Sequence, residues 1–169
     1  MTGDSTTAFS LRRGTPGLRI GAESMTMGVR GMVQNVVHLD DVVATEEDLL
    51  GNIGQGMEIA QDAMMFARLG IAAIAGGALM RCIQMMHSYA VNRRVSAGPL
   101  IDQPLIQEWM AEAIESTEVV QQLVARVADG LDRSEEVPVE LFVVAKTSAP
   151  ELLWCSIDRC VQLLGGRGY

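Results

Sequence analysis

The longest apolar segment of the sequence runs from Met57 to Arg94 and is followed by no proline until Pro99. Its letters are MEIAQDAMMFARLGIAAIAGGALMRCIQMMHSYAVNRR, with apolar residues on nearly every side of a helical projection. The segment predicts one helix of about 35 residues, about 50 Å long at 1.5 Å per residue. A helix that is apolar around most of its girth has to be covered by other helices. The chain is therefore expected to contain a helical bundle.

Two further segments, residues 105–130 and 139–166, repeat apolar side chains at helical spacing. Gly130 is predicted to cap the end of the first of these helices. Pro138 precedes the second helix, and Pro150 lies inside it, where we expect a kink or a break. Together with the long apolar segment, these residues predict three long helices, to which a fourth is needed for a closed bundle.

The segment before the helices has a different pattern. Residues 1–56 contain short runs that are β-branched or alternate apolar with polar residues, separated by glycine and proline. About three such strands are too few for a stable independent sheet. We therefore predict a mainly α chain in which residues 1–56 are a partial β-domain remnant and residues 57–169 are an incomplete helical bundle domain.

The net charge and the apolar runs of the sequence limit the classes of function that the chain can have. The 21 acidic and 13 basic residues give a net charge of −8, which argues against binding to nucleic acid or to an anionic membrane surface. No run of about 18 uncharged apolar residues is present, and the first ten residues lack the features of a signal peptide. We expect a soluble, cytoplasmic protein without membrane insertion.

The cysteines Cys82, Cys155 and Cys160 are an odd number, and they lie within the helical patterns without the paired spacing of a metal site. They predict reduced thiols in the core and no metal.

Six blocks of sequence occur in the order and at the spacing found in one enzyme family: RRGTPGLRIG, MGVRGMVQNVVHLDDVVATEEDLLG, GQGMEIAQDAMMFARLGIAAIAGG, YAVNRR, GPL and QLLGGRGY. The chain resembles the second half of the acyl-CoA dehydrogenases. The resemblance implies the end of their middle β domain, followed by three antiparallel helices of their C-terminal four-helix bundle. It also implies that the N-terminal helical domain, the segments that hold the flavin ring and the fourth long helix are not within these residues.

The resemblance implies an FAD-dependent oxidoreductase of fatty acid metabolism that introduces a double bond next to an acyl thioester. Such a reaction needs a carboxylate that removes the α-proton and a flavin that accepts the β-hydride. In many members the base is a Glu beyond the Gly-Gly-x-Gly-Tyr turn, which here means beyond Tyr169. In others it lies in the first long helix, at the position of Ala67. Alanine cannot accept a proton, so the sequence contains no residue that can be named as the catalytic base.

Several residues that contact the cofactor in this family have matching positions in this chain. Arg93 matches the arginine that in this family reaches the FAD diphosphate, commonly across a subunit boundary, and a guanidinium suits a diphosphate. Gln162, Gly165 and Gly166 match the contacts on the adenine side of the cofactor. The two glycines are equally explained as a helix C-cap, and both roles can hold together. Arg68 falls in the substrate-side stretch, where a structural ion pair is an equally good interpretation.

Three departures from the family pattern leave a second function open. Ser96-Ala97 stands where the family usually has Phe-Gly, Pro104 replaces a glutamine that contacts the nucleotide, and Met65 replaces an acidic residue near Arg68. The alternative is a non-catalytic, dehydrogenase-like subunit or fragment that completes the FAD site or the oligomer of a partner chain.

The expected partners are an acyl-CoA or acyl-carrier thioester, an electron-accepting flavoprotein, and further copies of the chain or a partner dehydrogenase subunit. An incomplete bundle exposes an apolar patch that favours dimers or tetramers.

Overall fold

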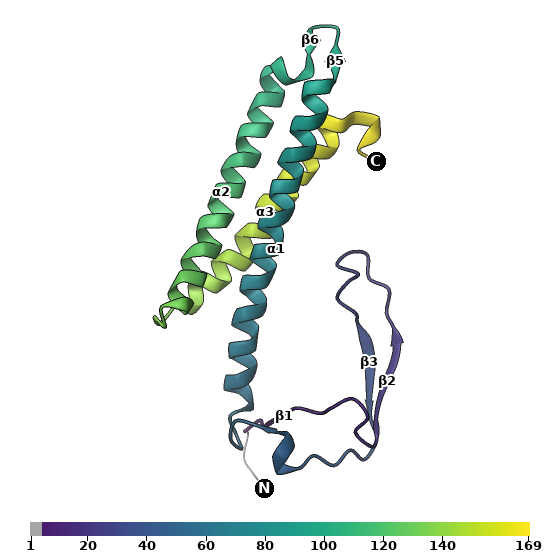
Figure 1. Ribbon diagram of the computed structural model, residues 1–169, viewed down its shortest axis with the longest axis vertical. Helices are drawn as coiled ribbons and strands as arrows, with labels where there is room; N and C mark the ends of the chain where they lie inside the picture. Colours follow the sequence, from purple (N-terminus) through teal and green to yellow (C-terminus); the bar gives the residue numbers. More distant parts are fainter. Residues whose placement is uncertain (1–4) are drawn as a thin grey trace. The chain divides into compact units, whose positions relative to one another are not determined.

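The computed structural model describes residues 5–169, and the chain divides into two compact units (Figure 1). The first unit ends at Asp62, and the second is Ala63–Tyr169. The division falls within the long helix α1 (Gly56–Asn92), and the domain boundary after residue 56 stays a prediction.

The first unit contains two antiparallel pairs of short strands. They are β1 (Ala8–Phe9) with β4 (Leu49–Leu50), and β2 (Leu18–Glu23) with β3 (Asn35–Leu39). The single-turn helix η1 (Glu46–Asp48) precedes β4. Many apolar side chains of β2 and β3 are exposed, among them Ile20 and Val37. Short strands with an uncovered apolar face agree with the prediction that this segment does not form an independent sheet.

The second unit is built on three long helices, as predicted. Helix α1 is followed by α2 (Pro104–Asp132) and α3 (Val139–Leu164). The hairpin β5 (Arg94–Val95) and β6 (Gly98–Pro99) and the turn η2 (Leu100–Asp102) join α1 to α2, and η3 (Gly165–Arg167) follows α3. Because successive helices run in opposite directions, α1 and α3 end at the same end of this unit, near the β5–β6 hairpin (Figure 1). This topology brings two segments that are distant in sequence to one place.

Residues from all three helices form the core of the second unit. One cluster consists of Ala72, Ala75, Leu79, Val120, Ala145 and Ala149. The other consists of Cys82, Met86, Ala90, Ile106, Ala113, Cys160 and Leu163. Small residues allow the helices to approach closely, and a Cβ on Gly76 would lie 3.3 Å from Cγ1 of Val120. Gly76 therefore lies at a close contact between α1 and α2, whereas a Cβ on Gly77 would meet open space.

The helices also carry apolar side chains on their outer faces. Ile74 of α1 is 65% exposed and Trp154 of α3 is 71% exposed. Helix α1 is long and apolar enough to cross a membrane by length and composition alone, a property that it shares with core helices of bundles. Its buried face contributes to both core clusters, which is the environment of a bundle helix.

One helix boundary differs from the sequence predictions. Helix α2 continues past Gly130 to Asp132, so the predicted cap is wrong. A Cβ at Gly130 would lie 2.6 Å from Cγ2 of Val137, so the glycine makes room for the connecting loop. Of the kink or break predicted at Pro150, the break does not occur, because α3 continues through this residue, and the kink stays a prediction.

One cysteine also differs from expectation. Cys155 is exposed, whereas Cys82 and Cys160 are buried as predicted, and burial raises the pKa of both buried thiols. Between the helices, Glu112 of α2 forms an ion pair with Arg159 of α3.

Candidate functional site

The end of α1 and the turn after α3 border one polar cavity. Its volume is about 170 Å³, and it is lined by Tyr89, Asn92, Arg93 and Arg167. Tyr89 and Asn92 lie on the last turn of α1, Arg93 follows its final residue, and Arg167 closes η3. The predicted cofactor residue Arg93 therefore lies beside the glycine-rich turn, and a second guanidinium, that of Arg167, lines the same cavity.

The glycine-rich turn has a shape that two of its glycines explain. Gly165 has φ of 56° and ψ of −135°, a conformation that residues with a Cβ avoid, and its N–H donates to the carbonyl of Gln162. A Cβ on Gly168 would lie 2.4 Å from the carbonyl oxygen of Val161. Gly166 has no such constraint, since the nearest atom to its Cβ position is Tyr169 Oη at 3.9 Å. The end of α3 therefore explains the glycine at 165. It does not explain the glycine at 166, where a ligand could approach the backbone closely.

The predicted site residues Gln162 and Arg68 do not line this cavity. Gln162 is exposed on the last turn of α3. Arg68 is half-buried on α1, and its Nη1 lies 3.5 Å from Sδ of Met65. Among residues 5–169, no carboxylate forms an ion pair with Arg68. The roles of Gln162 and Arg68 stay predictions.

The positions that depart from the family pattern have local structural explanations. Ser96 and Ala97 form the tip of the tight β5–β6 hairpin. Pro104 is the first residue of α2, where a proline fits because its missing N–H would have no helical partner. Ala67 is exposed on α1 and offers no proton acceptor.

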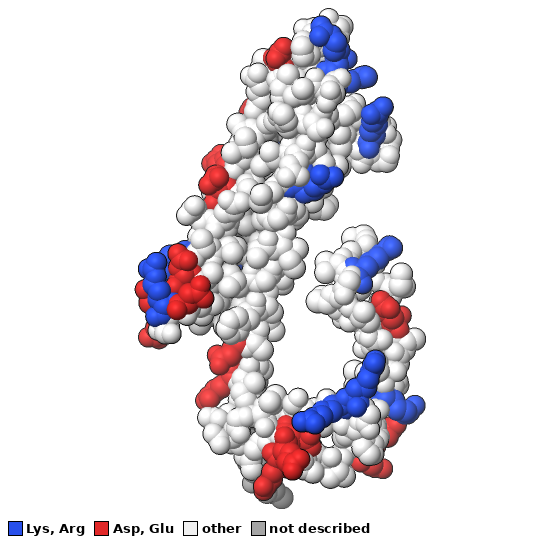
Figure 2. Space-filling model, in the orientation of Figure 1, with Lys and Arg blue, Asp and Glu red and all other residues white. Residues whose placement is uncertain are grey.

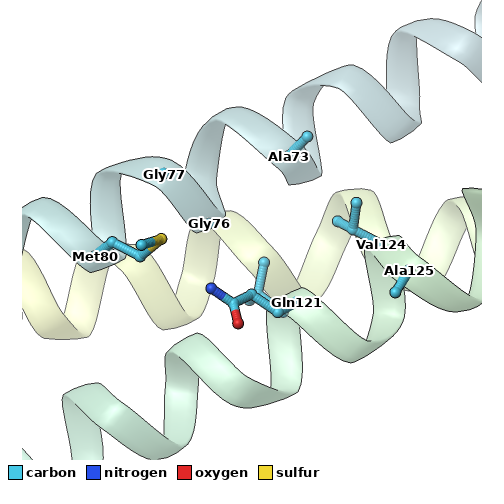
Figure 3. Close-up of a pocket in the computed structure, with 8 residues that line it drawn as sticks. Ala73, Gly76, Gly77, Met80, Gln121, Val124 and Ala125 are labelled. Atoms are coloured by element: carbon cyan, nitrogen blue, oxygen red, sulfur yellow. The ribbon is translucent and has the colours of Figure 1, made fainter.

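An apolar groove lies between α1 and α2 (Figure 3). Its volume is about 290 Å³, and it is lined by Ala73, Gly76, Gly77, Met80, Val120, Gln121, Val124 and Ala125. The amide of Gln121 is the polar side-chain group of this lining (Figure 3). The groove has the composition of a surface for another apolar side chain or helix rather than of a catalytic pocket.

Arg167 was not singled out by the sequence, although it lies within the motif QLLGGRGY. The family pattern assigns no residue type to this position, so the motif carries no signal for it. Its place beside the same cavity as Arg93 depends on the antiparallel packing that aligns the ends of α1 and α3. Only the three-dimensional arrangement identifies it as a site residue.

Comparison with known proteins agrees with this architecture. The family model described as "Acyl-CoA dehydrogenase, C-terminal domain" matches residues 54–169. The chain is 35% identical to (R)-benzylsuccinyl-CoA dehydrogenase of Thauera aromatica over 163 residues, which is 96% of the chain and 39% of that protein. It is 29% identical to the mitochondrial very long-chain specific acyl-CoA dehydrogenase of Macaca fascicularis, covering 96% of the chain and 25% of that protein.

A solved structure extends the comparison to the fold. Butyryl-CoA dehydrogenase from Megasphaera elsdenii superposes with a TM-score of 0.93 at 27% identity, covering 98% of this chain and 43% of the other. The chain thus spans between about a quarter and two fifths of the length of these relatives. The predicted fold class is confirmed, and the chain belongs to the acyl-CoA dehydrogenase family.

Proposed function

We propose that the chain is the C-terminal part of an FAD-dependent acyl-CoA dehydrogenase, which catalyses α,β-dehydrogenation of an acyl thioester in the cytoplasm. The observation that carries the proposal is the common cavity of Arg93 and the turn after α3, in a chain whose family is established. The substrate would be an acyl-CoA or an acyl-carrier thioester, and the electrons would pass to an electron-accepting flavoprotein.

The residues of the cavity fit the cofactor. Two guanidinium groups around one small cavity match the charge and the planar hydrogen-bonding geometry of a diphosphate. Arg93 would hold this diphosphate, and Gln162 and Gly166 would lie toward the adenine. FAD, when bound, supplies the acceptor for the β-hydride.

The catalytic base is the part of the reaction that residues 5–169 do not supply. Ala67 stands at the helix position that bears the base in some relatives, and alanine cannot take up the α-proton. The carboxylate would have to come from sequence outside these residues. The contribution of this chain is then to bind and orient the cofactor and to cover one side of the reaction site.

A second function is favoured by three departures from the family pattern. Ser96-Ala97 stands where the family usually has Phe-Gly, Pro104 replaces a glutamine that contacts the nucleotide, and Met65 replaces an acidic residue near Arg68. A non-catalytic subunit would keep Arg93 for FAD held mainly by a partner chain, without the companion contacts and without a base.

Association through the helices follows from the exposed apolar surface under either function. The groove between α1 and α2, together with exposed Ile74 and Trp154, would be buried in a dimer or tetramer, or by a partner dehydrogenase subunit. Light scattering on the purified chain at micromolar concentration tests this. A monodisperse monomer would contradict association.

The two functions are separated by co-expressing the chain with the product of the adjacent gene and recording the visible flavin spectrum of the purified complex. For a dehydrogenase, the complex retains FAD, and an added acyl-CoA bleaches the flavin under anaerobic conditions. A complex that retains FAD without bleaching across short, medium and long acyl-CoA substrates favours the non-catalytic subunit. A complex without flavin contradicts both functions.

A further inference from the structure

We infer that Arg167 is a second diphosphate-binding residue, which acts with Arg93 across the cavity between the end of α1 and the turn after α3. The inference rests on the proposed function, because it takes the ligand to be the diphosphate of FAD. It adds a residue to that site for which neither the sequence motifs nor the family comparison provides a role.

The first argument is the geometry of the cavity. Four residues line its volume of about 170 Å³, and two of them are arginines. The other two, Tyr89 and Asn92, offer a phenolic O–H and a side-chain amide as hydrogen-bond donors. Neither Arg93 nor Arg167 forms an ion pair with any carboxylate among residues 5–169. Both guanidinium groups therefore remain able to bind an external anion.

The second argument is the distribution of charge. The chain as a whole is acidic, yet residues 63–101 contain four arginines and no acidic residue. Figure 2 shows basic side chains at the end of the second unit where α1 ends, and acidic side chains along the α2 side. The C-terminal ends of α1 and α3 each bring a partial charge of about −0.5 to this place. Two full positive charges outweigh these two half charges, so the cavity keeps an excess positive charge.

The third argument is the backbone that presents Arg167. Gly165 and Gly168 fix the path of the turn, through a positive φ and a close approach to Val161 respectively. The N–H of Gly168 donates to the carbonyl of Gly165 at 2.8 Å and closes η3 around residue 167. A side chain on a closed turn loses less freedom on binding than one on an open loop. The backbone that carries Arg167 beside the cavity therefore has its course set before a ligand arrives.

The fourth argument is an adjoining cavity. This second space, about 390 Å³ in volume, shares Tyr89, Asn92 and Arg167 with the first and extends along α1 to Arg81. Arg167 stands at the junction of the two cavities. An elongated anion such as a dinucleotide diphosphate matches this connected shape better than a single inorganic phosphate does.

The test measures ligand affinity directly, so that it does not depend on turnover. The full 169-residue chain is titrated by calorimetry with ADP, FAD and riboflavin, which differ in the diphosphate. We expect ADP and FAD to bind and riboflavin, which has no phosphate, to bind far more weakly. Arg167→Gln and Arg93→Gln should each weaken ADP and FAD binding by about 10- to 100-fold, the range of a lost charge-assisted hydrogen bond.

The matched control is Arg133→Gln, which removes the same charge from the exposed α2–α3 connection and should leave ADP affinity unchanged. Arg167→Lys keeps the positive charge but not the planar hydrogen-bonding geometry of the guanidinium, and it should show an intermediate loss of ADP and FAD affinity. It also keeps the test decisive if circular dichroism finds the glutamine variant unfolded.

The outcomes separate the inference from the proposed function. If Arg93→Gln weakens FAD binding while both Arg167 variants stay within about twofold of the wild type, the inference is wrong and the FAD site stands. If ADP binding depends on both arginines but FAD does not bind, the diphosphate site is supported and the proposed cofactor is wrong. If the chain binds neither ADP nor FAD, the inference is overturned, and the flavin spectrum of the co-expressed complex still decides the function.

Discussion

The ion pair between Glu112 of α2 and Arg159 of α3 offers the sharpest test of how the bundle is held together. Oε2 of Glu112 contacts Nη1 of Arg159, and this oxygen is shielded from solvent. The contact lacks hydrogen-bond geometry, so the charge of Arg159 is the main compensation for this oxygen. The two side chains as a whole are 36% and 33% exposed.

These exposures set the expected magnitude. Exposed ion pairs contribute about 0 to 1 kcal/mol, whereas removing one partner of a buried pair costs about 3 to 5 kcal/mol. A pair that is about one third exposed and has one shielded oxygen falls between these limits, and we expect a coupling energy of about 1 to 2 kcal/mol. Arg159→Met should destabilise more than Glu112→Gln, because methionine retains the packing of the stem but leaves the shielded carboxylate oxygen without a counter-charge.

The assay is urea unfolding followed by helical circular dichroism, applied to the wild type, both single variants and the double variant. The exposed pair Arg126–Glu135, with its atoms 3.7 Å apart, provides the matched control and should show a coupling below about 0.5 kcal/mol. A coupling for Glu112–Arg159 that is no larger than that of the control would refute the reasoning from the shielded oxygen.

Three further predictions concern the core, the turn and the thiols. Leu79→Ala, at a fully buried position, should lower the free energy of unfolding by about 2 to 5 kcal/mol in the same urea assay. Gly168→Ala should disorder the C-terminal turn and speed its limited proteolysis, because its Cβ would clash with a carbonyl oxygen at 2.4 Å, whereas Gly166→Ala should cleave at the wild-type rate. In the native protein a thiol reagent should modify Cys155 alone, and all three cysteines should react in denaturant. Burial raises the pKa of Cys82 and Cys160 above the ordinary thiol value of 9.0. The free energy of unfolding should therefore be unaffected by these thiols below about pH 9 and fall above it, and the fall should be smaller when both are replaced by alanine.

The helices of the second unit could be predicted because their signals are local. The long proline-free apolar segment sets the length of α1, and Pro138 and Pro104 mark the starts of the following helices. Gly130 misled the prediction, since a glycine that would cap a helix and one that admits a neighbouring loop look alike in sequence. The exposure of Cys155 was equally hidden, because an apolar helix in an open bundle does not reveal which of its sides is covered.

The candidate site divides in the same way. Arg93 and Gly165 could be found from motifs that carry a family role or a helix-ending geometry. Arg167 could not, because its significance lies in a neighbour from a distant part of the chain rather than in its own sequence context. That Arg68 forms no ion pair with a carboxylate among residues 5–169 also depends on which side chains the fold brings within reach.

In the closed turn η3, the side chain at position 167 can change without a change in the backbone of the turn. Its two constrained glycines determine the course of the backbone, so exchange of the intervening side chain leaves the loop unchanged. If Arg167 binds the diphosphate as proposed, a single codon change at this position would alter nucleotide retention without the loss of folding that usually accompanies mutation of a binding site.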